Sequence, residues 1–203
     1  MKKRMTFIVV MLLAVLFLWK ENREQDRIQQ NIAGKVIRFH VMANSDSTGD
    51  QAIKLKVRDA VGQYLEPILQ KAKSREESEQ LIMDNRDAVI AIAENVIEEE
   101  GECYGAAAEL VVTEFPDKTY GDYTFPKGEY EALQIRLGEA EGHNWWCVLY
   151  PNMCFRGSVY EVVNQEAREE LREVLSTEEL RAVMNPGKLT IRWKVLEYFG
   201  IRS

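Results

Sequence analysis

The spacing of apolar residues changes near residue 106, and the change restricts the folds that the chain can adopt. From about residue 49 to residue 100, apolar residues recur every three or four positions, as in amphipathic helices. From residue 106 to residue 150 they follow a period of two, which is typical of strands. The chain is therefore expected to combine helices and strands around one core.

Individual elements follow from these periods and from the residues that interrupt them. Helices are predicted at residues 49–72, 75–100, 165–175 and 176–184. Strands are predicted at residues 35–43, 110–115, 130–137 and 144–150, with a loop at residues 119–128. The segment at 144–150 is apolar on both faces, which favours a central strand. Residues 189–199 fit either a strand or a helix, and we favour a helix.

The resulting order of elements is β-α-α-β-β-β-α-α-α. It predicts an α/β (α+β) fold, with one sandwich-like domain over residues 34–203. In this domain, helices would pack on a mixed or antiparallel sheet of about four strands. In the first strand, Ile37, Phe39 and Val41 share an apolar face, which is expected to be fully buried.

The N-terminal segment indicates export. Residues 1–19 begin Met-Lys-Lys-Arg and continue with an apolar run in which only Thr6 is polar. The basic residues hold the N-terminus in the cytosol, so the rest of the chain would lie outside. Ala14 is the only small residue near the end of the run, which favours an uncleaved anchor at residues 5–19 over a removed signal. Residues 20–33 are polar and are expected to form a tether.

Composition excludes several classes of function. The formal net charge is −7, whereas binding to nucleic acid or to anionic lipid requires a basic surface. Two histidines and three cysteines provide few metal ligands and no disulfide scaffold. We therefore expect no metal ion, no cofactor and no nucleic-acid partner.

One group of polar residues lies where the first strand meets the first helix. His40, Asp46 and Asp50 could serve in acid–base chemistry or bind a metal ion there. In the favoured interpretation, Asp46 and Ser47 instead cap the helix, and His40 lies on a polar strand face. A hydrolase or metal enzyme would require the three side chains to converge in a pocket.

The cysteines suggest a structural pair. Cys147 and Cys154 bracket a turn at Pro151, and an exported chain can be oxidised. Closing so short a loop would contribute about 2–3 kcal/mol. Two buried free thiols are the alternative. A nucleophile–base pair of Cys147 with His143 is disfavoured, because the two residues would lie ~13 Å apart along a strand.

Trp145 and Trp146 are adjacent on the last predicted strand, so they should face opposite sides of the sheet. Both are interpreted as core residues. An exposed tryptophan would instead indicate a glycan-binding module of the cell envelope.

Three segments carry a resemblance to a known family. They are Arg38-Phe-His-Val-Met-Ala-Asn-Ser-Asp-Ser47, Leu55-Lys-Val-Arg-Asp-Ala-Val61 and Asn144-Trp-Trp-Cys-Val-Leu-Tyr-Pro151. Together they closely resemble the stage II sporulation protein R family of endospore-forming bacteria. The candidate partner-binding or motif residues within these segments are Arg38, His40, Asn44, Ser45, Asp46, Asp50, Trp145 and Trp146.

The resemblance implies a signalling protein and not an enzyme. Members of that family are made in the forespore and exported into the space between the forespore and mother-cell membranes. There they trigger a membrane-embedded aspartic protease that matures the sigma-E precursor. Asn44 and Ser45 could either contact this partner or only form hydrogen bonds within the turn. We favour the turn network.

Overall fold

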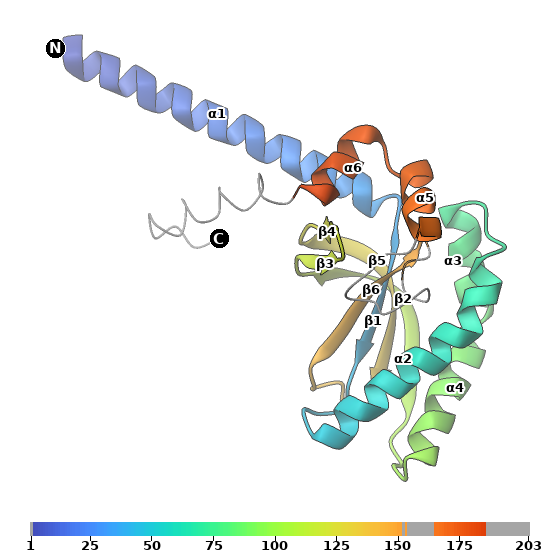
Figure 1. The fold of residues 1–203 in the computed structure, drawn as a ribbon. Helices are drawn as coiled ribbons and strands as arrows, with labels where there is room; N and C mark the ends of the chain where they lie inside the picture. The colour runs from blue at the N-terminus through green and yellow to red at the C-terminus, as the bar shows by residue number, and fades with distance from the viewer. Residues whose placement is uncertain (1, 152, 154–164, 186–203) are drawn as a thin grey trace.

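The computed structural model describes residues 2–151, 153 and 165–185. At its centre is a four-stranded sheet in the order β2-β5-β1-β6 (Figure 1). The strands are β1 (Ile37–Met42), β2 (Ala106–Phe115), β5 (Gly128–Leu137) and β6 (Asn144–Tyr150). Strand β1 runs parallel to β5 and antiparallel to β6, while β2 runs antiparallel to β5. The sheet is therefore mixed, and the predicted fold class is confirmed.

Three helices, α2 (Thr48–Leu69), α3 (Arg75–Asp84) and α4 (Arg86–Glu99), lie beside the sheet (Figure 1). Ile37, Phe39 and Val41 of β1 are all fully buried, as predicted for the apolar face of this strand. The side of α2 that carries Val57 and Val61 is buried with them in the same core. Alternation in the strand and helical spacing in α2 thus bring two apolar surfaces together.

The opposite face of β1 contacts a small hairpin. Strands β3 (Lys118–Tyr120) and β4 (Tyr123–Phe125) pair in the segment where we expected a loop. Gly121 at the turn has a φ of 55°, which glycine adopts without steric cost. The aromatic side chains of Tyr120 and Phe125 are buried, so tertiary packing explains why this short segment forms strands.

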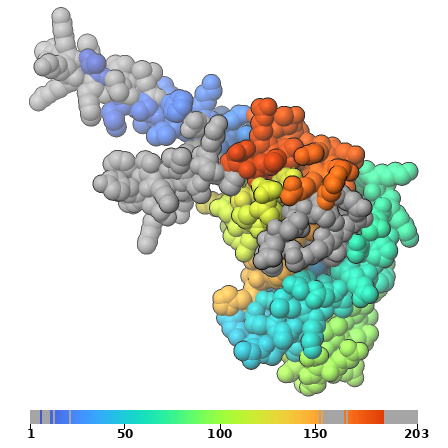
Figure 2. Space-filling view, viewed as in Figure 1, coloured from blue at the N-terminus to red at the C-terminus, as the bar shows by residue number. Residues whose placement is uncertain are grey.

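The N-terminal residues form one long helix, α1 (Lys2–Ala33), which projects from the body of the domain (Figure 2). It includes both the predicted export segment and the predicted tether. Its last turns contact β5 and α6, and Ile32 is fully buried in the core. Within the described residues, no helix combines the length and apolar character that crossing a membrane requires.

Two short helices, α5 (Gln165–Val174) and α6 (Thr177–Met184), follow the sheet, as predicted. The capping box at the start of α6 is present, with Ser176 and Glu179 exchanging hydrogen bonds. Residues 189–199, whose structure the sequence leaves open, lie outside the described residues.

Besides the loop expected at residues 119–128, two further sequence predictions were wrong in detail. The helix expected at residues 75–100 is divided at Asn85, whose Nδ2 donates to the Leu81 carbonyl at 2.8 Å. Strand β6 is at an edge of the described sheet and not at its centre. Its two faces are apolar because Trp145 packs against Phe39 on one side and Trp146 against His40 on the other.

Candidate functional site

The loop between β1 and α2 is held against the segment that joins β5 to β6. Ser47 caps α2, because its Oγ accepts a hydrogen bond from the Asp50 N–H at 3.0 Å, as predicted. Asp46, which was also expected to cap the helix, instead accepts from the His143 N–H. The N–H of Gly142 donates to the Ala43 carbonyl at 3.0 Å, which attaches the second segment to the first. We call the side chains gathered here the polar junction: Asn44, Ser45, Asp46, Asp50, Lys54, Tyr104 and His143.

Asp50 is the central acceptor of the polar junction. Only 7% of this residue is exposed, and its carboxylate accepts from Tyr104 Oη at 2.7 Å and from Asn44 Nδ2 at 3.1 Å. The Ser45 hydroxyl donates to the same carboxylate and is the largest cause that lowers the pKa of Asp50 below its usual range. Burial opposes this shift, so the donors outweigh desolvation and keep the carboxylate ionised.

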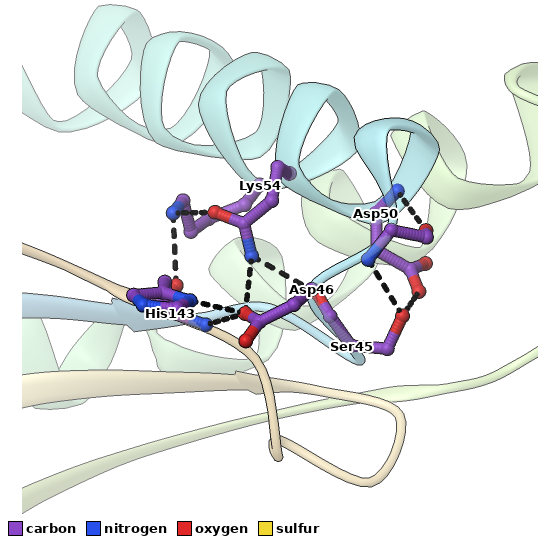
Figure 3. Close-up of polar contacts among 7 residues, drawn as sticks. Ser45, Asp46, Asp50, Lys54 and His143 are labelled. Atoms are coloured by element: carbon purple, nitrogen blue, oxygen red, sulfur yellow. Dashed lines mark hydrogen bonds and ion pairs between the residues drawn. The ribbon is translucent and has the colours of Figure 1, made fainter.

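Asp46 connects the loop to His143 (Figure 3). Its Oδ1 accepts from the His143 backbone N–H at 2.6 Å and contacts the ring Nδ1 at 2.5 Å. The contact with the His143 side chain is the main reason why the pKa of Asp46 is lowered. Both side chains are largely exposed, so this pair links two loops at the surface.

Lys54 closes the polar junction from α2 (Figure 3). Its ammonium group donates to the His143 carbonyl at 2.8 Å and to Gln51 Oε1 at 2.5 Å. Burial is the largest influence on this group and lowers the pKa of Lys54. Two carbonyl-type acceptors thus hold a cation that is only 5% exposed.

Two glycines allow the chains to approach closely here. A Cβ at Gly142 would lie 2.2 Å from the Ser45 carbonyl oxygen. Gly138 has a φ of 56°, and a Cβ there would lie 2.1 Å from Asn44 Oδ1. Any larger residue at Gly142 would push the two backbones apart.

His40 has no contact with Asp46 or Asp50, and its face of β1 is buried and not the polar face expected from the sequence. Its ring stacks on Trp146 with centroids 3.8 Å apart, and its Nδ1 lies 3.2 Å from Gln134 Nε2. Burial lowers the pKa of His40 to about 4, so the ring is neutral at neutral pH. His40, Asp46 and Asp50 each contact different groups, and no three His, Cys, Asp or Glu residues in the described part could hold a metal ion.

Arg38, a candidate partner contact from the sequence, is fully buried in its own domain. Its Nε donates to the Cys147 carbonyl at 2.9 Å, and its Nη2 donates to Tyr120 Oη at 3.1 Å. The rings of Phe115 and Tyr130 lie 4.3 and 4.9 Å from the guanidinium carbon. No carboxylate pairs with this cation among the described residues. Cation–π interactions with the aromatic rings therefore stabilise the buried charge.

The two tryptophans face opposite sides of β6, as predicted. Trp145 is only 4% exposed, and the Arg58 guanidinium lies 5.1 Å above its ring. Trp146 is half-buried and packs on His40 and Phe115. Neither indole therefore presents the exposed platform that glycan binding would require.

The cysteine prediction stays open. Cys147 is fully buried in β6, and Cys154 lies outside the described residues. Their pairing remains a prediction. Cys103 is an exposed free thiol.

Several members of the polar junction were missed in the sequence. Tyr104 contacts Asp50 across 54 residues, and His143 contacts Asp46 across 97 residues. No local pattern marks such contacts. The cap at Ser47 was found because it involves residues only three positions apart.

The chain was compared with known proteins. The family model described as stage II sporulation protein R matches residues 33–160, a range that contains the whole sheet and the polar junction. The chain is also 38% identical over 144 residues to stage II sporulation protein R of Bacillus subtilis (strain 168). This alignment covers 70% of the chain but 64% of the relative, which is less than two thirds of the relative's length. No solved structure matches.

Proposed function

Because the chain belongs to the stage II sporulation protein R family, we propose that it is an exported signal that activates a membrane-embedded aspartic protease across the sporulation septum. Activation of that protease would trigger maturation of the sigma-E precursor. The family itself supports a role in sporulation. The observation that carries the finer proposal is the match over residues 33–160, which includes every strand of the sheet.

The proposal includes a location and a membrane contact. The chain would be made in the forespore and would act between the forespore and mother-cell membranes. Residues 1–19 would direct export, and residues 5–19 would anchor the chain if they are not removed. The acidic domain would then face the membrane-bound protease.

The arrangement of polar groups favours binding over acid–base chemistry. Side chains of Asp46 and Asp50 accept hydrogen bonds within the polar junction, and His40 is a buried neutral ring on the sheet. Groups that hold two loops together present a fixed surface to a partner. A hydrolase would instead need these groups to reach one reacting atom.

Co-expression in a non-sporulating bacterium tests the proposal. The host would carry the full chain, the candidate protease and the sigma-E precursor, and precursor cleavage would be followed by immunoblot. We expect cleavage only when all three are present. Deletion of residues 5–19 should abolish cleavage by retaining the domain in the cytosol, and a protease with its catalytic aspartate replaced should be inactive. Cleavage that does not depend on the chain would contradict the proposal.

The same host also tests whether the chain acts as a signal or is itself a hydrolase. A general acid or base typically contributes about 10²–10⁴-fold to a rate. We expect His40→Ala to reduce precursor cleavage by far less than this, and only as far as it reduces stability. A loss in the catalytic range, with a native circular dichroism spectrum, would favour the hydrolase.

A further inference from the structure

Strand β2 forms one edge of the sheet. All ten of its residues pair with β5 in continuous register, and β2 pairs with no other strand in the described part of the chain. The opposite edge strand, β6, has a register shift against β1. Bulges of that kind protect an edge from adding a further strand, and β2 has none.

Two hydrogen bonds show which residues of β2 turn their backbone outward. The Gly105 carbonyl accepts from the Gly138 N–H, so odd-numbered residues face β5. The Ala108 carbonyl accepts from Arg86 Nε of α4, so even-numbered residues face away from β5. The N–H and C=O groups of Leu110, Val112 and Glu114 therefore point outward, and hydrogen bonds to them are absent among the described residues.

The side chains along this edge protect it only through the acidic charges of Glu109 and Glu114. Residues 106–115 contain no lysine and no proline, which are the usual means of protecting an edge strand. Val112 is 66% exposed, the largest exposed fraction among the large apolar residues that the structure describes. A regular edge strand with free outward backbone groups is a template for strand addition.

Two carboxylates at one end of this edge lack an ion-pair partner among the described residues, whereas Glu109 and Glu131 pair with Arg136 and Arg75. Glu114 lies directly opposite Glu129 in the β2–β5 register, and both side chains are exposed. Neither forms an ion pair with a described residue, although like charges in this position destabilise a sheet. Glu129 and Val112 also line a hollow of about 480 Å³ that reaches Gln29 of α1. A cation from outside would fit between these carboxylates.

We propose that the outer edge of β2 binds an extended, basic segment of a partner protein as an added strand. The segment pairs its backbone with Leu110, Val112 and Glu114, and it places Lys or Arg side chains beside Glu114 and Glu129. A second copy of the chain is a poorer occupant, because each copy carries a net charge of −7. The proposal deepens the signalling function above and rests on it only for the identity of the partner.

A peptide experiment tests the edge without the protease. The probes are two seven-residue peptides, one alternating Lys with Val and the other alternating Glu with Val. Amide hydrogen exchange of the full chain is measured by NMR in a zwitterionic detergent. We expect the Lys peptide to slow exchange at Leu110, Val112 and Glu114 by about tenfold at low salt, and less at high salt. The Glu peptide should have no effect.

Charge reversal supplies the matched control. Glu114→Lys with Glu129→Lys should transfer the protection from the Lys peptide to the Glu peptide. Glu98→Lys with Glu99→Lys makes the same change in net charge at the exposed end of α4 and should leave the preference unaltered. No protection by the Lys peptide, equal protection by both, or a dimer that Val112→Lys abolishes in analytical ultracentrifugation would overturn the proposal.

The co-expression host then relates the edge to signalling. Val112→Lys should reduce precursor cleavage at least about tenfold, whereas Met83→Lys, at an exposed apolar residue of α3, should not. If the unaltered chain activates the protease and Val112→Lys does so equally well, the edge is not the contact. If the unaltered chain fails to activate, the proposed function fails, and the peptide experiment alone decides whether the edge binds.

Discussion

The guanidinium carbon of Arg38 lies 4.3 Å from the centroid of the Phe115 ring in the interior of the domain. The two residues belong to β1 and β2, which are separated by β5 in the sheet. Tyr130 of β5 and Phe125 of β4 place their rings 4.9 and 5.2 Å from the same carbon. A cation from β1 is thus buried among aromatic rings that come from three other strands.

Two replacements of Arg38 distinguish the effect of its charge on stability from the effect of its packing. Arg38→Lys keeps a buried charge but loses the Nε donor to Cys147, so we expect the free energy of unfolding to fall by about 3 kcal/mol. Arg38→Met removes the charge and fills the space between the rings, and should cost about 1–2 kcal/mol. Urea denaturation of the full chain measures both. A smaller loss for the lysine variant would show that the charge itself stabilises the fold.

Stability should depend on pH through His40. The pKa of this buried ring is about 4 in the folded chain, against about 6.5 in the unfolded chain. As the pH falls from 6.5 to 4, the His40 ring binds a proton in the unfolded chain but stays neutral in the folded chain. The free energy of unfolding should therefore fall over this window, by up to about 3 kcal/mol.

Denaturation at a series of pH values measures this dependence. His40→Gln should flatten the profile between pH 6.5 and pH 4, whereas His143→Gln, at a largely exposed ring, should retain it. Asp46 and Asp50 have lowered pKa values, so their contributions are lost only at more acidic pH. An equal slope in His40→Gln would contradict the assignment.

The polar junction should tolerate no side chain at Gly142. Because a Cβ there would meet the Ser45 carbonyl at 2.2 Å, Gly142→Ala should destabilise the chain by about 2–3 kcal/mol. Gly49→Ala is the control, since its nearest atom, Ser47 Oγ, would be 3.8 Å away in the first turn of α2. That substitution should stabilise the chain by about 0.5–1 kcal/mol. Thermal unfolding gives both values.

We expect Asn44 to affect signalling only through the stability of the fold. Its Oδ1 accepts from the Glu139 N–H at 3.0 Å and its Nδ2 donates to Asp50, so Asn44→Ala should cost about 1–3 kcal/mol. In the co-expression host, precursor cleavage should fall only in step with the melting temperature. Lost cleavage with unchanged melting would instead identify Asn44 as a partner contact. Ser45→Ala tests the neighbouring donor in the same way.

The cysteine pair can be tested directly on exported protein. In denaturant, which exposes every thiol, Cys147 and Cys154 should resist alkylation until a reductant is added, because they are expected to be bonded. Cys103 is exposed and should be labelled at once, which provides an internal control. Mass spectrometry that finds Cys147 and Cys154 both labelled without reduction would refute the pairing.

The sequence by itself determined the features that depend on near neighbours. The buried face of Ile37, Phe39 and Val41 follows from a period of two, and the cap at Ser47 follows from residues three positions apart. Both depend on backbone geometry that a strand or a helix imposes wherever it lies. A sheet of about four strands covered by helices also followed, because the order of elements leaves few ways to bury these faces, but the sequence left a mixed and an antiparallel sheet both open.

Only the tertiary structure decided how distant segments meet. Asn85 divides a predicted helix and accepts a hydrogen bond from the Tyr64 hydroxyl of α2 at 2.7 Å. Strand β6 took an edge position because pairing, and not apolar content, sets the order of strands. Tyr104 and His143 reached Asp50 and Asp46 only after the sheet had brought their segments together. Such contacts join residues far apart in the chain, so their energies depend on a geometry that no local pattern encodes.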